Sequence, residues 1–131
     1  MLFRSEAAKT KLLDVKKRIP QKLPLIGYEF YDEGLYHWAA WCFLSAFKAG
    51  DDGAGNNLAY MVRHGEVPME LEVPNPLALL AKGAKEGDGY ALVNQALCNA
   101  SGIGTKIDWG KADQSIQKVS RLVDLQLASP K

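Results

Sequence analysis

The sequence contains few cysteines and no long apolar run. Only two of its 131 residues are cysteines, Cys42 and Cys98, and they lie 56 positions apart with no other cysteine near either of them. This excludes a disulfide-rich scaffold, a zinc ribbon and a Cys-x-x-Cys redox site. The longest nearly apolar stretch, residues 39–47, is less than half the length that a membrane span needs.

The amino-terminal end lacks the apolar core of about seven or more residues that is typical of a secretory signal peptide. Hydrophobic residues make up 47% of the chain, which is too many for a disordered polypeptide. One domain is expected at this length, and it is long enough to bury a core. The sequence therefore predicts a globular domain of a reducing compartment, and we expect it in the cytoplasm.

Charge divides the sequence, although the formal net charge is only +1. Residues 1–24 carry seven basic and two acidic groups, whereas residues 25–110 carry five basic and eleven acidic groups, a net charge of −6. Such an asymmetry favours partners of opposite charge. Two interpretations stay open: the basic leader, residues 1–24, binds a partner, or it packs on the acidic body, residues 25–110.

Helical periodicity predicts an all-α fold. A leader helix is expected at residues 5–19 with Ser5 as its N-cap, and Pro20 and Pro24 are expected to end it because proline has no amide hydrogen to donate. Residues 20–32 are interpreted as a connector. Apolar residues at helical spacing predict further helices at residues 33–49, 76–86 and about 111–127.

A segment of sixteen residues occurs twice, at an offset of 37 residues: GDDGAGNNLAYMVRHG at 50–65 and GDGYALVNQALCNASG at 87–102. The coinciding pairs are Gly50/Gly87, Asp51/Asp88, Ala54/Ala91, Asn57/Asn94, Ala59/Ala96 and Gly65/Gly102. The glycines suit helix ends, the aspartates (or Asp52 in the first copy) suit N-caps, and the alanines allow close helix packing. We therefore predict two helical hairpins, residues 33–67 and 76–104, stacked as an α-solenoid between flanking amino- and carboxyl-terminal helices.

The two segments resemble the Sel-one-like repeat, a member of the tetratricopeptide superfamily. The first copy matches the family pattern at Gly50, Asp51, Ala54, Asn57, Leu58, Tyr60, Met61 and Gly65. The second matches it at Gly87, Asp88, Ala91, Asn94, Ala96 and Gly102, with Gln95 where the family prefers leucine. The resemblance covers residues 33–104 and implies an α/α fold that binds other proteins, without shared catalytic residues. The chain departs from the family in having only two copies.

Few side chains suggest catalysis or metal binding. The groups considered are His37, His64, Cys42, Cys98 and the carboxylates Glu66, Glu70 and Glu72. Neither histidine has another ligand at metal-binding spacing, and both cysteines lie in apolar helical contexts that are typical of core residues. The carboxylates lie in a proline-rich loop, where solvated charge or partner contact is the simpler explanation. We therefore predict no catalytic residue, no cofactor and no metal site.

Aromatic side chains concentrate in one segment. Eight of the twelve lie between residues 28 and 47, and the acidic residues of this segment favour contact with a basic partner. Tyrosine and tryptophan are enriched at binding hot spots, while a core packed beneath the leader is the alternative. The candidate partner-binding residues are Tyr28, Tyr31, Asp32, Glu33, Tyr36, His37, Glu66, Glu70 and Glu72.

The sequence thus predicts a non-enzymatic protein-binding module. Because the acidic body complements a basic partner and two repeats offer room for one partner, we expect an immunity protein that neutralises a basic, nuclease-type bacterial toxin. A small adaptor or a secretion chaperone of the helical-repeat type is the alternative. Nucleic-acid binding through the basic leader is less favoured, because the aromatic segment lacks interleaved basic residues. Neither a membrane nor a metal partner is expected.

Overall fold

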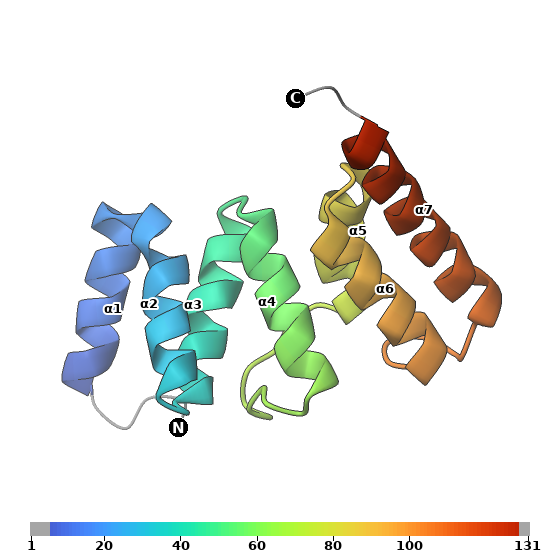
Figure 1. Cartoon of the computed structure of the whole chain (residues 1–131). Helices are drawn as coiled ribbons and strands as arrows, with labels where there is room; N and C mark the ends of the chain where they lie inside the picture. The colour runs from blue at the N-terminus through green and yellow to red at the C-terminus, as the bar shows by residue number, and fades with distance from the viewer. Residues whose placement is uncertain (1–5, 129–131) are drawn as a thin grey trace.

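The computed structural model describes residues 6–128, and the regular elements in that range are all helical. They are α1 (Glu6–Arg18), the 3-10 turn η1 (Pro20–Lys22), α2 (Leu23–Asp32), α3 (Tyr36–Lys48), α4 (Asp52–Arg63), α5 (Pro76–Lys85), α6 (Gly89–Ser101) and α7 (Trp109–Ala128). From α2 to α7 each helix packs against the next one in sequence (Figure 1). The prediction of an all-α fold is confirmed.

Residues 20–32 were predicted as a connector, and this was wrong: they form η1 and α2. The reason is that proline ends one helix but also suits the first turn of the next, where no intrahelical N–H bond is lost. Pro20 and Pro24 stand at such first-turn positions of η1 and α2. The new helix buries Leu23 and Gly27 and packs along α3. The aromatic residues after Pro24 are therefore presented by a helix.

The other predicted helices are present with shifted ends. The leader helix runs from Glu6 to Arg18, and Ser5 lies outside the described residues. Gly34 has a left-handed backbone (φ 76°), so α3 begins at Tyr36 and not at residue 33. α7 begins at Trp109, two residues earlier than predicted, because the Asp108 side chain accepts a hydrogen bond from the Lys111 N–H (3.0 Å).

The repeated residues have the same local roles in both copies. Left-handed glycines follow α3, α4, α5 and α6, namely Gly50 (φ 105°), Gly65 (68°), Gly87 (85°) and Gly102 (71°). Asp51 accepts a hydrogen bond from the Ala54 N–H (3.1 Å), and Asp88 accepts one from the Tyr90 N–H (2.9 Å). Both aspartates are therefore N-caps, and Asp51 rather than Asp52 caps α4.

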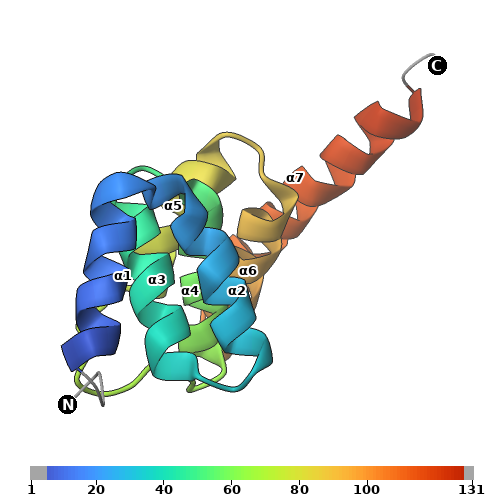
Figure 2. The same ribbon diagram turned by 90° about the vertical axis from the view of Figure 1, so that its left-hand side faces the viewer.

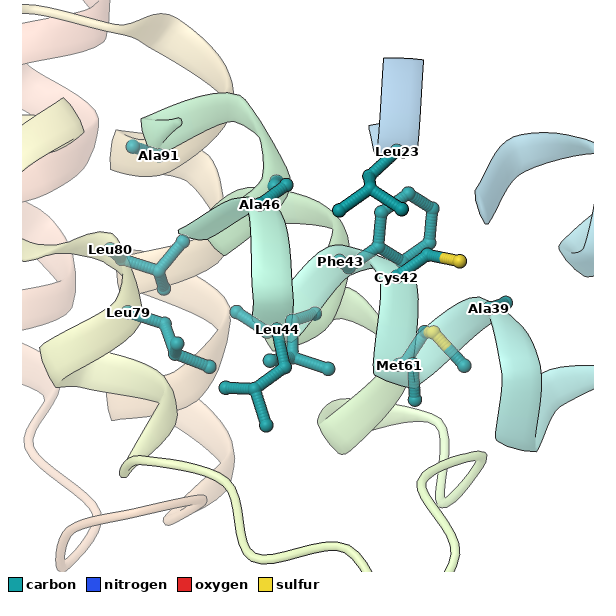
Figure 3. Packing of buried hydrophobic residues seen from close by; sticks show 14 of the residues in the cluster. Leu23, Ala39, Cys42, Phe43, Leu44, Ala46, Met61, Leu79, Leu80 and Ala91 are labelled. Atoms are coloured by element: carbon teal, nitrogen blue, oxygen red, sulfur yellow. The ribbon is translucent and has the colours of Figure 1, made fainter. Parts of the chain in front are cut away.

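The core is one cluster of buried apolar side chains that joins α1 to α6. Figure 3 shows Leu23, Phe43 and Met61 together at one end, and Leu80 near the α5 and α6 end. Each of these side chains is almost completely buried, and burial of one such side chain stabilises the fold by about 1.5–3 kcal/mol. The core therefore fixes α2, α3 and α4 relative to one another.

Glycine allows the closest helix approach. A Cβ atom added at Gly55 of α4 would lie 2.6 Å from the Leu79 carbonyl oxygen of α5 and 2.7 Å from the Phe47 ring. At Gly83 of α5 it would lie 3.2 Å from the Cβ atom of Ala91, which is fully buried. Small residues therefore set the distance between α4, α5 and α6.

The helices form a layered arrangement in which α2, α4 and α6 lie side by side. α4 contacts α6, and a hydrogen bond between Asn57 and Tyr28 joins α4 to α2. Figure 2 shows α1 and α3 beside this layer and the carboxyl-terminal part of α7 projecting beyond the other helices. Between residues 6 and 128, no helix has both the length and the apolar character that crossing a membrane requires.

Candidate functional site

Helix α1, part of the basic leader, packs on the body through apolar contact. Leu12 is buried in the core, and the Lys16 ammonium lies 5.8 Å from the centre of the Trp41 ring. Within residues 6–128 the ion pairs are Arg18–Asp14 and Lys82–Asp52. Neither pair joins α1 to the acidic body. The lysines of α1 remain exposed.

The aromatic residues between 28 and 47 divide between core and surface. Phe43 is buried, while Phe30, Trp38, Trp41 and Phe47 are half-buried against the core. The three tyrosines of the segment behave differently: Tyr28 is 48% exposed, Tyr36 is exposed, and Tyr31 is half-buried. The core interpretation therefore holds for Phe43 and the four half-buried rings, whereas the tyrosines form the accessible side of the segment.

Two of these tyrosines, Tyr28 and Tyr31, line cavities over α2, α4 and α6. One cavity of about 300 Å³ is lined by Tyr28, Tyr31, Asp32, Phe43, Asn57, Tyr60 and Met61. A second cavity of about 400 Å³ is lined by Tyr28, Gly53, Asn56, Asn57, Tyr60, Asp88, Tyr90 and Asn94. Because Tyr28, Asn57 and Tyr60 line both cavities, the two adjoin, and together we call them the tyrosine groove.

Hydrogen bonds hold the α2 wall of the tyrosine groove. The Asn57 amide donates to the Tyr28 hydroxyl oxygen (2.8 Å), and the Tyr31 hydroxyl donates to both carboxylate oxygens of Glu66 (3.0 and 3.1 Å). Burial raises the pKa of Tyr31 well above its usual range, and the hydrogen bond and negative charge of Glu66 raise it further. The Tyr31 hydroxyl therefore remains protonated and keeps α2 attached to the loop that follows α4.

A second set of polar contacts joins α4 to α6. The Arg63 guanidinium donates to the Asn94 side-chain oxygen (3.1 Å) and lies 5.6 Å from the centre of the Tyr60 ring. Asn94 is the repeat equivalent of Asn57, which bonds to Tyr28 of α2. Each of the two asparagines therefore links its helix to the preceding helix of the same layer.

The structure brings together about half of the predicted site. Tyr28, Tyr31 and Asp32 line the tyrosine groove, the Tyr36 ring centre lies 5.1 Å from that of Tyr31, and Glu66 bonds to Tyr31. The remaining predicted residues line neither cavity of the groove: they are Glu33, His37, Glu70 and Glu72. His37 instead packs its ring against Trp38, with ring centres 5.3 Å apart.

The sequence prediction missed the contributions of α4 and α6 to the groove. The missed residues are Gly53, Asn56, Asn57, Tyr60, Met61, Asp88, Tyr90 and Asn94, together with Phe43 of α3. One signal was present, because Asn57 and Asn94 coincide at the 37-residue offset. A polar residue kept at the same position of both copies is compatible with a role outside the core, and both asparagines do lie on the groove side of α4 and α6.

The cysteines are core residues, as predicted. Burial raises the pKa of Cys42 to about 12, and burial also raises the pKa of Cys98, where the nearby charge of Arg63 acts in the opposite direction. Both thiols are therefore protonated at neutral pH, which disfavours nucleophilic chemistry. Nowhere in the described part of the chain do three His, Cys, Asp or Glu side chains converge as a metal site would require.

Comparisons with models of protein families, with curated proteins and with solved structures found no match. The resemblance to the Sel-one-like repeat therefore stays a prediction. What the structure establishes is an all-helical chain whose helices pack in sequence. The inference of function accordingly rests on the groove itself.

Proposed function

We propose that the chain is a non-enzymatic protein-binding module and that the tyrosine groove receives a segment of its partner. The observation that carries the proposal is the position of the tyrosines. The chain has five, and all of them lie in the groove or beside it: Tyr28, Tyr31, Tyr60 and Tyr90 line it, and Tyr36 contacts Tyr31. Tyrosine supplies a large contact area with a polar end at low entropic cost, which suits a binding surface.

The architecture that we propose for this module is a short helical repeat of the Sel-one-like type. Three pairs of equivalent residues support it, since Gly50 and Gly87, Asp51 and Asp88, and Asn57 and Asn94 have matching local roles. In such an array α2, α4 and α6 present one continuous face. The groove lies on that face, so its length grows with each added repeat.

The charge of the body supports a basic partner. Residues 25–110 have a net charge of −6, and the groove itself contains the carboxylates of Asp32 and Asp88. Opposite charge accelerates association and disfavours acidic competitors. We therefore propose, as the specific form of this function, an immunity protein that neutralises a basic, nuclease-type toxin by direct binding.

The experiment begins with the protein that co-purifies with the tagged chain from its native cells. Its dissociation from the wild type is compared with dissociation from the double variant Tyr28→Ala/Tyr60→Ala by biolayer interferometry. The matched control is Leu13→Ala, since Leu13 is 45% exposed on α1 and lies outside the groove. We expect dissociation at least about tenfold faster for the tyrosine variant, because hot-spot truncations cost about 2 kcal/mol or more, and an unchanged rate for the control.

The toxin part has its own test. The partner is expressed alone and together with the chain, and growth of the cells is followed. We expect growth arrest by the partner alone, rescue by the wild type and loss of rescue with the tyrosine variant. A partner that is harmless alone contradicts immunity and favours an adaptor or a secretion chaperone. Equal dissociation of the wild type and the tyrosine variant contradicts the groove as the binding site.

A further inference from the structure

The smaller cavity of the tyrosine groove combines aromatic rings with one carboxylate. Four rings line it, those of Tyr28, Tyr31, Tyr60 and Phe43, and Asp32 is the acidic residue among its lining side chains. Phe43 and Met61 are almost fully buried, so they form the floor of the cavity. Tyr28 and Tyr60 are 48% and 41% exposed, so they form walls that solvent reaches.

The walls of this cavity are already in place before any partner binds. The rings of Tyr28 and Phe43 form a T-shaped pair with centres 5.4 Å apart, and those of Tyr31 and Tyr60 form another at 6.4 Å. The hydroxyl groups of Tyr28 and Tyr31 are held by the hydrogen bonds with Asn57 and Glu66 described above. Binding therefore costs little ordering of these side chains.

The chemistry of the lining favours a cation that carries an aliphatic stem. The faces of aromatic rings attract ammonium and guanidinium groups, and Arg63 already lies 5.6 Å from the Tyr60 ring without lining the cavity. Asp32 is exposed and forms no ion pair within residues 6–128. The side-chain oxygen of Asn57 is a further acceptor, because the amide nitrogen is the atom that bonds to Tyr28.

We infer that this cavity binds the side chain of a lysine presented by the partner protein. The methylene groups lie against Phe43 and Met61, and the ammonium group reaches the tyrosine rings and the Asp32 carboxylate. This inference rests on the proposed function, since it names the group of the partner that enters the groove. The observations that carry it are the four-ring lining, the single carboxylate at the same cavity and the acidic body around it.

Methionine methyl groups offer a direct probe of the cavity. The chain has three methionines, of which Met61 lines the cavity and Met69 is completely exposed in the loop after α4. The protein, labelled with ¹³C in its methionine methyl groups, is titrated with Nα-acetyl-lysine methylamide at constant ionic strength and followed by NMR. This compound keeps the charged side-chain ammonium group. The norleucine analogue, which keeps the aliphatic stem without the charge, is titrated in parallel. We expect the lysine analogue to shift the Met61 methyl signal and leave Met69 unmoved.

The charged group should account for a measurable part of the affinity. One cation–π or exposed ion-pair contact corresponds to an affinity change of about 2- to 5-fold, so we expect the norleucine analogue to bind at least that much more weakly. Asp32→Asn should weaken the lysine analogue by about 2- to 5-fold and leave the norleucine analogue unchanged. Asp113→Asn on α7 is the matched control and should change neither.

Three results overturn the inference: equal binding of the two analogues, no Met61 shift with either, or an Asp32→Asn variant that keeps the full preference for lysine. These failures differ from a failure of the proposed function. If the lysine analogue does not bind but Tyr28→Ala/Tyr60→Ala still accelerates partner dissociation, the lysine site is wrong and the binding module stands. If the analogue binds but the partner dissociates from Tyr28→Ala/Tyr60→Ala at the wild-type rate, the proposed function is wrong.

Discussion

Replacing Gly55 by alanine should separate α4 from α5. The added Cβ atom would lie 2.6 Å from the Leu79 carbonyl oxygen, a contact that real Cβ atoms essentially never make. Because the obstacle is backbone rather than the end of a flexible side chain, one of the two helices must move. Overpacking of this kind lowers the free energy of unfolding by about 1–3 kcal/mol. The higher helix propensity of alanine raises it by about 0.5–1 kcal/mol. Since the obstacle is a backbone atom, the upper half of the overpacking cost applies, about 2–3 kcal/mol, and we expect a net destabilisation of about 1–2 kcal/mol for Gly55→Ala.

The matched control is Gly89→Ala in the first turn of α6. A Cβ atom added at Gly89 meets no atom within 4 Å, so only the propensity gain remains. Thermal unfolding is followed by circular dichroism, in which about 1 kcal/mol corresponds to about 4 °C for a chain of this size. We expect the Tm to fall by about 4–8 °C for Gly55→Ala and to stay level or rise for Gly89→Ala. A Gly55→Ala protein as stable as the wild type would show that α4 and α5 do not approach this closely.

Three further predictions concern the core and the charged loop. Ala54→Leu and Ala91→Leu should each lower the free energy of unfolding by about 1–3 kcal/mol, measured by urea unfolding, because both positions are buried and become overpacked. Ala78→Leu, on the exposed side of α5, should change it little. Equal stability of all three variants would contradict the burial of Ala54 and Ala91. Burial raises the Cys42 pKa from 9.0 to about 12, so the Cys42 thiol ionises in the unfolded chain before it ionises in the folded one. The free energy of unfolding therefore decreases as the pH rises from 9 to 12. The stability difference between wild type and Cys42→Ala should thus shrink by about 1.4 kcal/mol between pH 7 and pH 10, and a constant difference would refute the buried thiol. Glu70→Lys/Glu72→Lys should slow association with a basic partner and flatten its salt dependence while leaving dissociation unchanged; association at the wild-type rate in low salt would exclude long-range steering by this loop.

The local features of the fold were predictable from the sequence because they depend on near neighbours. Asp51 and Asp88 cap the helices that follow them, and a left-handed glycine precedes each of the two aspartates. Apolar spacing placed most helices within a few residues of their observed ends. The exception is α2, since Pro24 is compatible with both the end of one helix and the first turn of another.

The candidate site was only partly predictable because the groove is formed between helices. Tyr28, Tyr31 and Asp32 belong to one segment, so its composition identified them. Tyr60 joins them only because α4 packs beside α2, a relation that no local pattern contains. The sequence also placed Glu70 and Glu72 in the site, but they do not line the groove, since proximity in sequence to Glu66 does not bring them to it.

The central claim, that a partner docks in the tyrosine groove, is tested most directly by site-specific photo-crosslinking in native cells. The photoreactive residue p-benzoylphenylalanine replaces Tyr60, with Gln117 on the exposed side of α7 as the control position. We predict a crosslink to one protein from position 60, none from position 117, and competition by excess wild-type chain but not by Tyr28→Ala/Tyr31→Ala. Contrary evidence would be crosslinking from position 117 without any from position 60, or equal competition by the wild type and by Tyr28→Ala/Tyr31→Ala.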